Sequence, residues 1–360
     1  MSTSSAGTAQ PAARTFTVDR LIEFITRSYV AVGMPEADAR TTATLMIEAD
    51  LLGSDAHGIF RLPQYIRRAR EGGFNLRPDI RIERETAATA VLDGDNAMGH
   101  LVVQRAAQIA IAKAREAGVA WVGLHHGNHA GAGAVYARMP LAHGMIGIYG
   151  AVGSANHLPP WGGMEMLLST NPLAIAVPAC EEPPVVLDMA TTVASYGKIK
   201  ARAQRGESMP EGWMMGYDGK PLLDPKRSNE GFLMPIGGHK GYGLALMIGL
   251  FAGSLNGAAI GRDVVDFNAD YRSVTNTGQC VIAVNPAAFG DPQVIGRDVD
   301  RVVREMRSAK RLPGVDRIQV PGEGSHRRRE TQLREGITLP APLLDILARL
   351  AGDLAIAPLA

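Results

Sequence analysis

A histidine and an arginine four residues apart are the first candidates for chemistry in this sequence. His57 and Arg61 flank Gly58, and if a helix starts at Gly58 the two side chains sit one turn apart and point to the same side. An imidazole and a fixed guanidinium suit a substrate that carries a carboxylate beside a group that gains or loses a proton. The alternative interpretation is a helix cap followed by a surface arginine.

A second segment gathers three histidines and several glycines directly after an expected strand. His125, His126 and His129 could be metal ligands, but no Asp or Glu follows them before Glu165, so a metallohydrolase would lack a local general base. Alternatively, the glycines let backbone amides approach a phosphate or a nicotinamide. The segment fits a Rossmann fingerprint poorly, because Tyr136 occupies the last glycine position, so a bound dinucleotide would imply a different fold. A histidine-capped turn from strand to helix is the third interpretation.

Two further segments contain more glycine and polar residues than a core needs. Residues 154–172 form a long connector with a single acidic residue, and long loops of this kind are often binding loops. Residues 237–243 place Lys240 in a glycine-rich loop that opens an apolar helix, where an ammonium group can meet an anionic ligand. Simple helix capping remains the alternative for this loop.

These segments need elements to position them, and the apolar periodicity indicates helices at both ends of the chain around an α/β middle. Thr17 is a suitable N-cap for the first helix, and Gly118 a suitable stop for the longest one. We expect a disordered tail over residues 1–15, a helical subdomain formed by residues 16–76 with about 310–360, and an α/β domain over residues 77–309. Helices are expected over residues 18–29, 35–52, 59–70, 99–117, 193–205, 298–310 and 341–351, and strands over residues 80–84, 90–92, 119–124, 145–152, 173–178, 185–189 and 280–284.

Composition narrows the classes of partner. The 360 residues are 46% apolar, and 37 Lys and Arg against 36 Asp and Glu leave a net charge of +1, which gives no electrostatic reason to expect nucleic acid or an anionic membrane. Residues 241–261 carry no charge but contain six glycines, which favours a buried core helix of about 14 residues over a membrane span. Cys180 and Cys280 lie in apolar sequence surroundings and are too few for a disulfide framework, so we expect a reducing, cytoplasmic setting.

Taken in order, these segments resemble the malate/L-lactate dehydrogenase type 2 family, whose members include sulfolactate, ureidoglycolate and diketogulonate dehydrogenases and piperideine-2-carboxylate reductases. The likeness runs from about Val18 to Leu350. The motifs that carry it are His57-Gly58 with Arg61, Asn128-His129, Pro160-Trp161-Gly162-Gly163, Thr170-Asn171-Pro172, Asp188-Met189-Ala190-Thr191-Thr192, Gly238-His239-Lys240-Gly241-Tyr242-Gly243 and Pro321-Gly322-Glu323.

The resemblance implies hydride transfer between NAD or NADP and C2 of a small 2-oxo or 2-hydroxy acid, or reduction of a cyclic imino acid such as piperideine- or pyrroline-2-carboxylate. It also implies a non-Rossmann mixed-sheet domain for the cofactor and a homodimer. By resemblance, His57 is the proton donor, Arg61 its close partner and Thr170 a further hydroxyl of the active site, and His129 is either a proton acceptor or a cofactor contact. The other residues implied to surround the cofactor are Ser154, Asp188, Met189, Ala190, His239, Lys240, Gly322 and Glu323.

One position departs from the family pattern. Many relatives have serine immediately before the histidine of the first motif, whereas this chain has Ala56, so Asp55, Ser54 or a water must orient the imidazole.

Two other classes of protein compete with the dehydrogenase. A zinc hydrolase would use the three histidines of the second segment, and a non-catalytic protein on the same fold would only bind a small ligand. Because no carboxylate or thiolate follows the histidines before Glu165, we expect no metal there.

Overall fold

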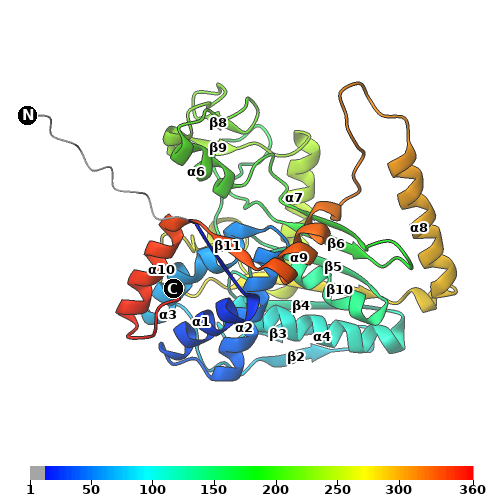
Figure 1. The fold of residues 1–360 in the computed structure, drawn as a ribbon, viewed down its shortest axis with the longest axis horizontal. Helices are drawn as coiled ribbons and strands as arrows, with labels where there is room; N and C mark the ends of the chain where they lie inside the picture. Colours follow the sequence, from blue (N-terminus) through cyan, green and yellow to red (C-terminus); the bar gives the residue numbers. More distant parts are fainter. Residues whose placement is uncertain (1–12, 360) are drawn as a thin grey trace, which may run out of the picture. The chain divides into compact units, whose positions relative to one another are not determined.

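The computed structural model describes residues 13–359 and divides them into two compact units. One unit combines the two ends of the chain, residues 13–66 and 327–359, and the other comprises residues 67–326. Figure 1 shows the helices and strands of both units.

The first unit is built mainly from helices. Helices α1 (Val18–Val30) and α2 (Glu36–Leu51) pack together, and Thr17 caps α1 by accepting a hydrogen bond from the backbone N of Arg20 at 3.4 Å. Two short 3-10 helices, η1 (Asp55–His57) and η2 (Ile59–Arg61), then lead into α3 (Leu62–Arg70). The unit is completed by the end of α9 (Glu323–Glu335), by α10 (Ala341–Asp353) and by strand β1 (Arg14–Phe16) paired with β11 (Ile337–Leu339).

The second unit contains a seven-stranded sheet in the order β2-β3-β4-β10-β5-β6-β7. Only β3 and β4 run parallel to each other, and every other neighbouring pair is antiparallel. The mixed sheet confirms the prediction of an α/β fold without a Rossmann topology. Its strands are β2 (Arg81–Glu85), β3 (Thr89–Asp93), β4 (Val119–Gly127), β5 (Ile146–Ala151), β6 (Leu173–Val177), β7 (Val185–Met189) and β10 (Thr277–Val284).

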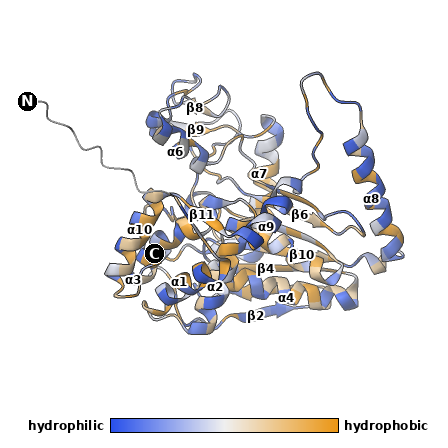
Figure 2. Ribbon diagram, viewed as in Figure 1, coloured by the Kyte–Doolittle hydropathy of each residue, from blue (hydrophilic) through white to orange (hydrophobic). Residues whose placement is uncertain are grey.

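Three helices cover this sheet. The longest, α4 (Gly99–Ala117), packs on β3, β4 and β10, and it ends at Gly118, whose φ of 80° suits a glycine. Helix α5 (Gly133–Ala137) packs on β5 to β7, and α7 (His239–Ala252) packs on β5 and β10. Figure 2 shows apolar residues gathered along the strands of the sheet.

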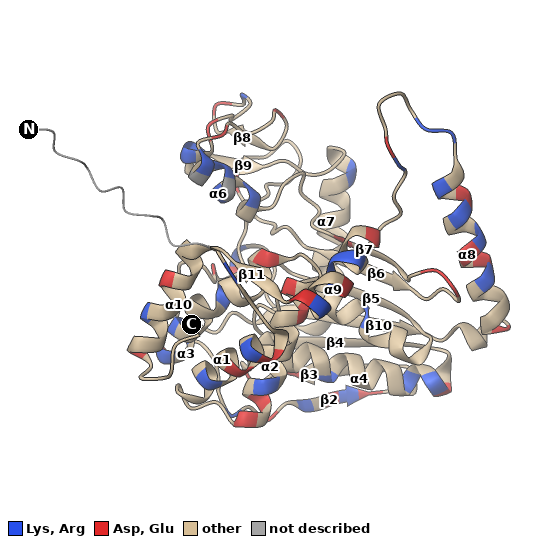
Figure 3. Ribbon diagram, viewed as in Figure 1, with Lys and Arg blue, Asp and Glu red and all other residues tan. Residues whose placement is uncertain are grey.

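The remaining elements of this unit lie outside the sheet. They are α6 (Tyr196–Arg205), the hairpin of β8 (Met214–Gly216) with β9 (Gly231–Leu233), and α8 (Pro292–Ser308). Charges of both signs line α8 (Figure 3). Arg304 pairs with Glu181 at 2.6 Å and with Glu182 at 2.9 Å, so ion pairs fix one face of α8 to the turn after β6.

The structure revises several details of the sequence analysis. Of the expected tail, residues 1–12 lie outside the described residues, and Arg14–Phe16 form β1. Cys280 is buried as expected, but Cys180 is exposed, because its segment turns at the surface beside α8. The uncharged stretch forms the 14-residue helix α7, and none of the helices in the described part of the chain is long and apolar enough to cross a membrane.

Candidate active site

His57 and Arg61 lie in consecutive 3-10 turns and not on one helix. Gly58 separates the turns with φ −94° and ψ −139°, so the expectation of a single helix starting at Gly58 is wrong. Arg61 is fixed locally: its Nε donates to the carbonyl of Ala56 at 2.9 Å and its Nη1 donates to Oε1 of Gln64 at 2.5 Å. The guanidinium therefore folds back toward the turn that carries the imidazole.

A buried carboxylate explains the break at Gly58. Asp50, near the end of α2, is only 3% exposed, and its Oδ2 accepts a hydrogen bond from the backbone N of Ile59 at 2.9 Å. A Cβ at position 58 would lie 2.0 Å from Oδ1 of Asp50, so only glycine fits there. Burial raises the pKa of Asp50 to about 7, although the bond from Ile59 opposes the shift.

Two arginines of helix α9 bind carboxylates close to this segment in the sequence. Arg328 donates to Oδ1 of Asp55 at 2.7 Å and packs against Gly53, and Arg329 pairs with Glu48 at 2.6 Å. The carboxylate of Asp55, which we considered as an orienting group for His57 in place of the missing serine, is thus held by Arg328. Asp50 and Arg328 are supporting residues that the sequence analysis did not identify.

The surroundings of His57 favour a neutral imidazole. The residue is half-buried, and loss of water lowers its pKa to about 4, with the positive charge of Arg61 acting in the same direction. Tyr65 is fully buried one turn beyond Arg61, and burial raises the pKa of its hydroxyl, so the hydroxyl stays protonated. At neutral pH His57 is therefore able to accept a proton, and Arg61 supplies the fixed positive charge.

In the second unit, His129 sits on a rigid turn after β4. The side chain of Asn128 is fully buried and donates to the carbonyl of Ala97 at 2.9 Å, while its Oδ1 accepts from Thr275 at 2.9 Å. The ring of His129 stacks on Phe267, with centroids 5.2 Å apart, and the backbone N of Phe267 donates to the carbonyl of Ser154 at 2.9 Å. Phe267 therefore contacts both His129 and Ser154.

Asp188 lies at the end of β7, beside the start of α5. Its Oδ2 accepts from the backbone N of Ala134 at 2.9 Å, and Gly133 leaves room for the carboxylate. Partial loss of water raises the pKa of Asp188 to about 6, although the bond from Ala134 opposes the shift. Met189 and Ala190 continue from this position as a half-exposed edge.

Hydrogen bonds fix the backbone of Thr170 and the side chain of its neighbour Asn171. The backbone N and the hydroxyl of Thr191 both donate to its carbonyl, at 2.9 and 2.8 Å. The next residue, Asn171, is buried and links the carbonyl of Ala245 in α7 to the backbone N of Gly153. The long loop therefore presents the half-buried Thr170 from a rigid base.

The glycine-rich loop before α7 joins the same region of the second unit. The backbone N of Ile236 donates to the carbonyl of Thr191 at 3.0 Å, so this loop, the segment after Asp188 and the segment of Thr170 are neighbours. His239 and Lys240 are exposed in the first turn of α7, and the ring of Trp161 lies 6.3 Å from that of His239. Among the described residues, Lys240 has no hydrogen-bond or ion-pair partner.

The turn at Gly322 and Glu323 lies against the middle of β7. The backbone N of Val186 donates to the carbonyl of Pro321 at 3.1 Å, and a Cβ on Gly322 would lie 2.8 Å from Val186. Gly322 also has a φ of 84°, so glycine is needed there for both reasons. Glu323 pairs with Arg307 at 3.4 Å.

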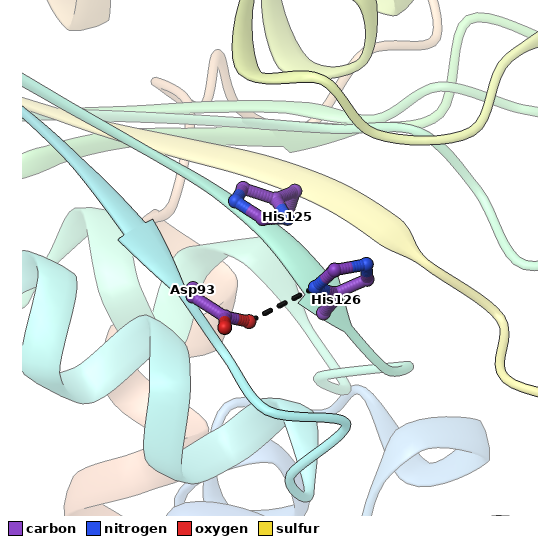
Figure 4. A group of neighbouring side chains, drawn as sticks. All are labelled: Asp93, His125 and His126. Atoms are coloured by element: carbon purple, nitrogen blue, oxygen red, sulfur yellow. Dashed lines mark hydrogen bonds and ion pairs between the residues drawn. The ribbon is translucent and has the colours of Figure 1, made fainter. Parts of the chain in front are cut away.

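His125 and His126 have the acidic neighbours that the sequence analysis did not foresee. Glu83 lies 2.8 Å from Nε2 of His125. Asp93 lies 2.9 Å from Nδ1 of His126 (Figure 4). The premise that the histidines lack a carboxylate is therefore wrong, because β2 and β3 supply the acids from earlier in the chain. Glu165, the nearest acid in the downstream sequence, instead pairs with Arg262 at 2.9 Å.

The second unit offers groups suited to a nicotinamide nucleotide. Lys240 is an exposed cation at the amino end of a 14-residue helix, where a phosphate is favoured, and Gly237 and Gly238 keep the preceding backbone free of side chains. Polar groups on the half-buried His129 and Ser154 and on the exposed Asp188 can hydrogen-bond an amide or a ribose. These residues fit such a cofactor by donor type and exposure.

Comparisons with known proteins find relatives over most of the chain. A model of the malate/L-lactate dehydrogenase family matches residues 16–348. An L-sulfolactate dehydrogenase of Methanothermobacter thermautotrophicus is 36% identical over 92% of this chain and 95% of its own, and a malate dehydrogenase of Pyrococcus abyssi is 36% identical over 92% and 93%. The solved structure of sulfolactate dehydrogenase from Methanocaldococcus jannaschii superposes with a TM-score of 0.88 at 34% identity, covering 95% of this chain and 98% of the other.

Proposed function

Because the chain belongs to the malate/L-lactate dehydrogenase family, we propose that it transfers a hydride between NAD or NADP and C2 of a small 2-hydroxy or 2-oxo acid, with His57 moving the accompanying proton. The enzyme is an oxidoreductase acting on 2-hydroxy acids. The observation that carries the assignment of His57 is its half-buried imidazole beside the guanidinium of Arg61, on a turn held by buried Asp50.

His57 has the protonation state that the oxidation needs. A neutral imidazole takes the hydroxyl proton of the 2-hydroxy acid while the hydride leaves C2 for the cofactor, and in the reverse direction the imidazolium returns that proton to the oxygen. The carboxylate of a bound acid offsets the charge of Arg61, which raises the pKa of His57 and allows the imidazolium to form during reduction.

Arg61 is the proposed carboxylate ligand. A guanidinium carries five N–H donors in a planar fork, and the bonds to Ala56 and Gln64 keep that fork in one orientation. Binding the carboxylate there fixes the position of C2 relative to the imidazole. The hydroxyl of Thr170 is proposed as a further contact to the substrate.

We assign the cofactor to the second unit. The nicotinamide nucleotide supplies or accepts the hydride when bound, and Lys240 with His239 would hold its phosphates. His129, Ser154, Asp188, Met189, Ala190 and the turn at Gly322 and Glu323 would contact the remainder of the cofactor. The proton is moved by His57, so we place His129 at the nicotinamide as a neutral donor or acceptor.

We further propose that the protein uses NAD or NADP, forms a homodimer and works in the cytoplasm. Two free cysteines, Cys180 and Cys280, are consistent with a reducing compartment.

A substrate panel tests the function. We expect purified protein to oxidise NADH or NADPH with one or more of pyruvate, oxaloacetate and sulfopyruvate, and to reduce NAD or NADP with the corresponding hydroxy acid. Piperideine-2-carboxylate belongs in the same panel, because reduction of a C=N bond needs the same hydride and proton. No nucleotide oxidation with any of these compounds would contradict the proposal.

A further inference from the structure

Two consecutive histidines of β4 bring their rings together, although neighbouring residues of a regular strand point to opposite faces. The rings of His125 and His126 are 4.4 Å apart and lie edge to face. The cause is a β-bulge: Leu124 pairs with Gln279 and Gly127 pairs with Thr277, so two residues of β4 stand opposite one residue of β10. Bulges commonly redirect side chains in this way.

The backbone of His126 pays a conformational penalty for this arrangement. Its φ is 47°, in the left-handed region that residues other than glycine adopt uncommonly. Asn276 keeps it there, because its Oδ1 accepts a hydrogen bond from the backbone N of His126 at 2.7 Å. Strain of this kind persists where the surrounding structure holds it, often at a functional site.

Two carboxylates from adjacent strands complete the cluster. Oδ1 of Asp93, at the end of β3, lies 2.9 Å from Nδ1 of His126, and Oε2 of Glu83, on β2, lies 2.8 Å from Nε2 of His125. Figure 4 shows Asp93 directed at His126, with His125 as the preceding residue of the same strand. One ligand atom each from Asp93, His125 and His126 lies within 4.8 Å of the other two.

We propose that Asp93, His125 and His126 bind a divalent transition-metal ion such as Zn²⁺. Imidazole nitrogen and carboxylate oxygen are its usual ligands outside thiolate sites, and at a tetrahedral zinc with bonds of about 2.1 Å, neighbouring ligand atoms are about 3.4 Å apart. Small side-chain movements therefore reach this spacing from separations of at most 4.8 Å, with the 2.9 Å contact between Asp93 and His126 opening slightly. Water completes the coordination.

Glu83 has a distinct place in this site. Its bond to Nε2 of His125 leaves Nδ1 of that ring for the metal, which is the carboxylate–histidine–metal arrangement that fixes the tautomer of a ligating histidine. His126 is 45% exposed, so the ion can enter from solvent.

A metal ion at this site would have a structural role and no catalytic one. It lies three residues before His129 in the chain, and a bound ion would hold the bulge that leads into the Asn128-His129 turn. No step of the proposed hydride transfer involves this ion, so the inference stands or falls independently of the dehydrogenase activity.

Metal titration of tag-free, chelator-treated full-length protein tests the proposal. We expect calorimetry with Zn²⁺ to give one equivalent, and Co²⁺ to give the visible absorption of a four-coordinate ion with nitrogen and oxygen ligands. His125→Gln, His126→Asn and Asp93→Asn should each weaken binding at least ~100-fold, and Glu83→Gln about 10-fold, as expected for loss of a residue that orients a ligand. Asparagine tolerates the left-handed backbone at position 126, so His126→Asn should fold.

His143→Asn is the matched control, because His143 is another surface histidine, bonded to Arg115 at 2.9 Å outside the cluster. It should bind Zn²⁺ as the wild type does. The melting temperature should rise with Zn²⁺ in the wild type and in the control but not in His126→Asn. Less than half an equivalent of bound metal, or binding that the three ligand variants leave unchanged, would overturn the proposal. Equal loss in His143→Asn would also overturn it, because it would show non-specific binding by surface histidines.

Discussion

The carboxylate of Asp50 accepts a hydrogen bond from the backbone N of Ile59 at 2.9 Å and fills the space where a side chain at Gly58 would lie. This contact spans the turn that carries His57, so a group outside the recognisable motif sets the position of the proposed proton carrier. Substitutions of Asp50, Gly58 and His57 are therefore expected to have different effects.

Asp50→Asn should change the pH dependence of stability. The folded-state pKa of about 7 exceeds the usual carboxyl value, so between about pH 4 and pH 7 the folded protein holds a proton that the unfolded chain has lost. This contribution to the free energy of unfolding is present below about pH 4 and is lost as the pH rises to 7. As the pH rises from 5 to 8, we expect the free energy of unfolding of Asp50→Asn to increase by at least ~1 kcal/mol relative to that of wild type.

Urea unfolding at pH 5 and pH 8 measures this difference. Glu36→Gln, an exposed carboxyl on the same helix, is the control and should show no such gain. If Asp50→Asn and wild type keep the same stability difference at both pH values, the carboxyl of Asp50 does not titrate in this range.

Gly58→Ala should destabilise the first unit and displace His57. The added Cβ would lie 2.0 Å from Oδ1 of Asp50, so the turn must move, at an expected loss of roughly 1–3 kcal/mol. Turnover should fall with it. Gly352→Ala in α10 is the control, because a Cβ there meets nothing within 4 Å. Thermal unfolding and steady-state rates measure both effects, and wild-type rates in Gly58→Ala would show that the turn tolerates the shift.

Arg61→Lys tests recognition of the carboxylate. The ammonium keeps the positive charge beside His57 but cannot reproduce the planar pair of donors, so kcat/KM for the acid should fall at least ~10-fold while NADH binding stays within a factor of about three. Fluorescence titration with NADH separates the two quantities. Arg67 is exposed and pairs with Glu71 at 2.8 Å, so Arg67→Lys, the control, should leave both kcat/KM and NADH binding unchanged. An unaltered kcat/KM in Arg61→Lys would remove Arg61 from substrate binding.

Lys240→Gln tests the cofactor assignment. Loss of a cation beside the phosphates should weaken NADH or NADPH binding about 10-fold at low salt, and the deficit should shrink as ionic strength rises. Lys220→Gln is the control on another exposed loop of the same unit. Equal nucleotide affinity of Lys240→Gln and wild type at low salt would place the phosphates elsewhere.

The sequence predicts those parts of the fold that depend on local patterns. Helix α4 begins at Gly99 and ends before Gly118 as expected, because its apolar periodicity and its stop signal are both local. Helix α9 was missed because its segment, EGSHRRRETQLRE, carries a single large apolar residue, Leu333, and so offers no periodic apolar face. Two of its arginines nevertheless pair with Glu48 and with Asp55, which lies two residues before His57.

The groups missed around the candidate sites are distant in sequence. Asp50 reaches the backbone N of Ile59 only because α2 and the following turn fold back on each other, and Asp93 reaches His126 only because β3 and β4 are parallel neighbours. The left-handed backbone of His126 depends on Asn276, 150 residues later. Spacing in the sequence contains no record of such contacts, so motifs predict which residues act but not what supports them.

The turnover number of His57→Gln, measured with the nicotinamide nucleotide and the best acid of the substrate panel, tests whether His57 moves the proton. We expect a loss in kcat of ~100- to 10,000-fold, with the dissociation constant of the nucleotide within a factor of about three of wild type. His143→Gln, the exposed control, should keep wild-type turnover. A kcat of His57→Gln within a factor of about three of wild type would contradict the claim and remove His57 from the reaction.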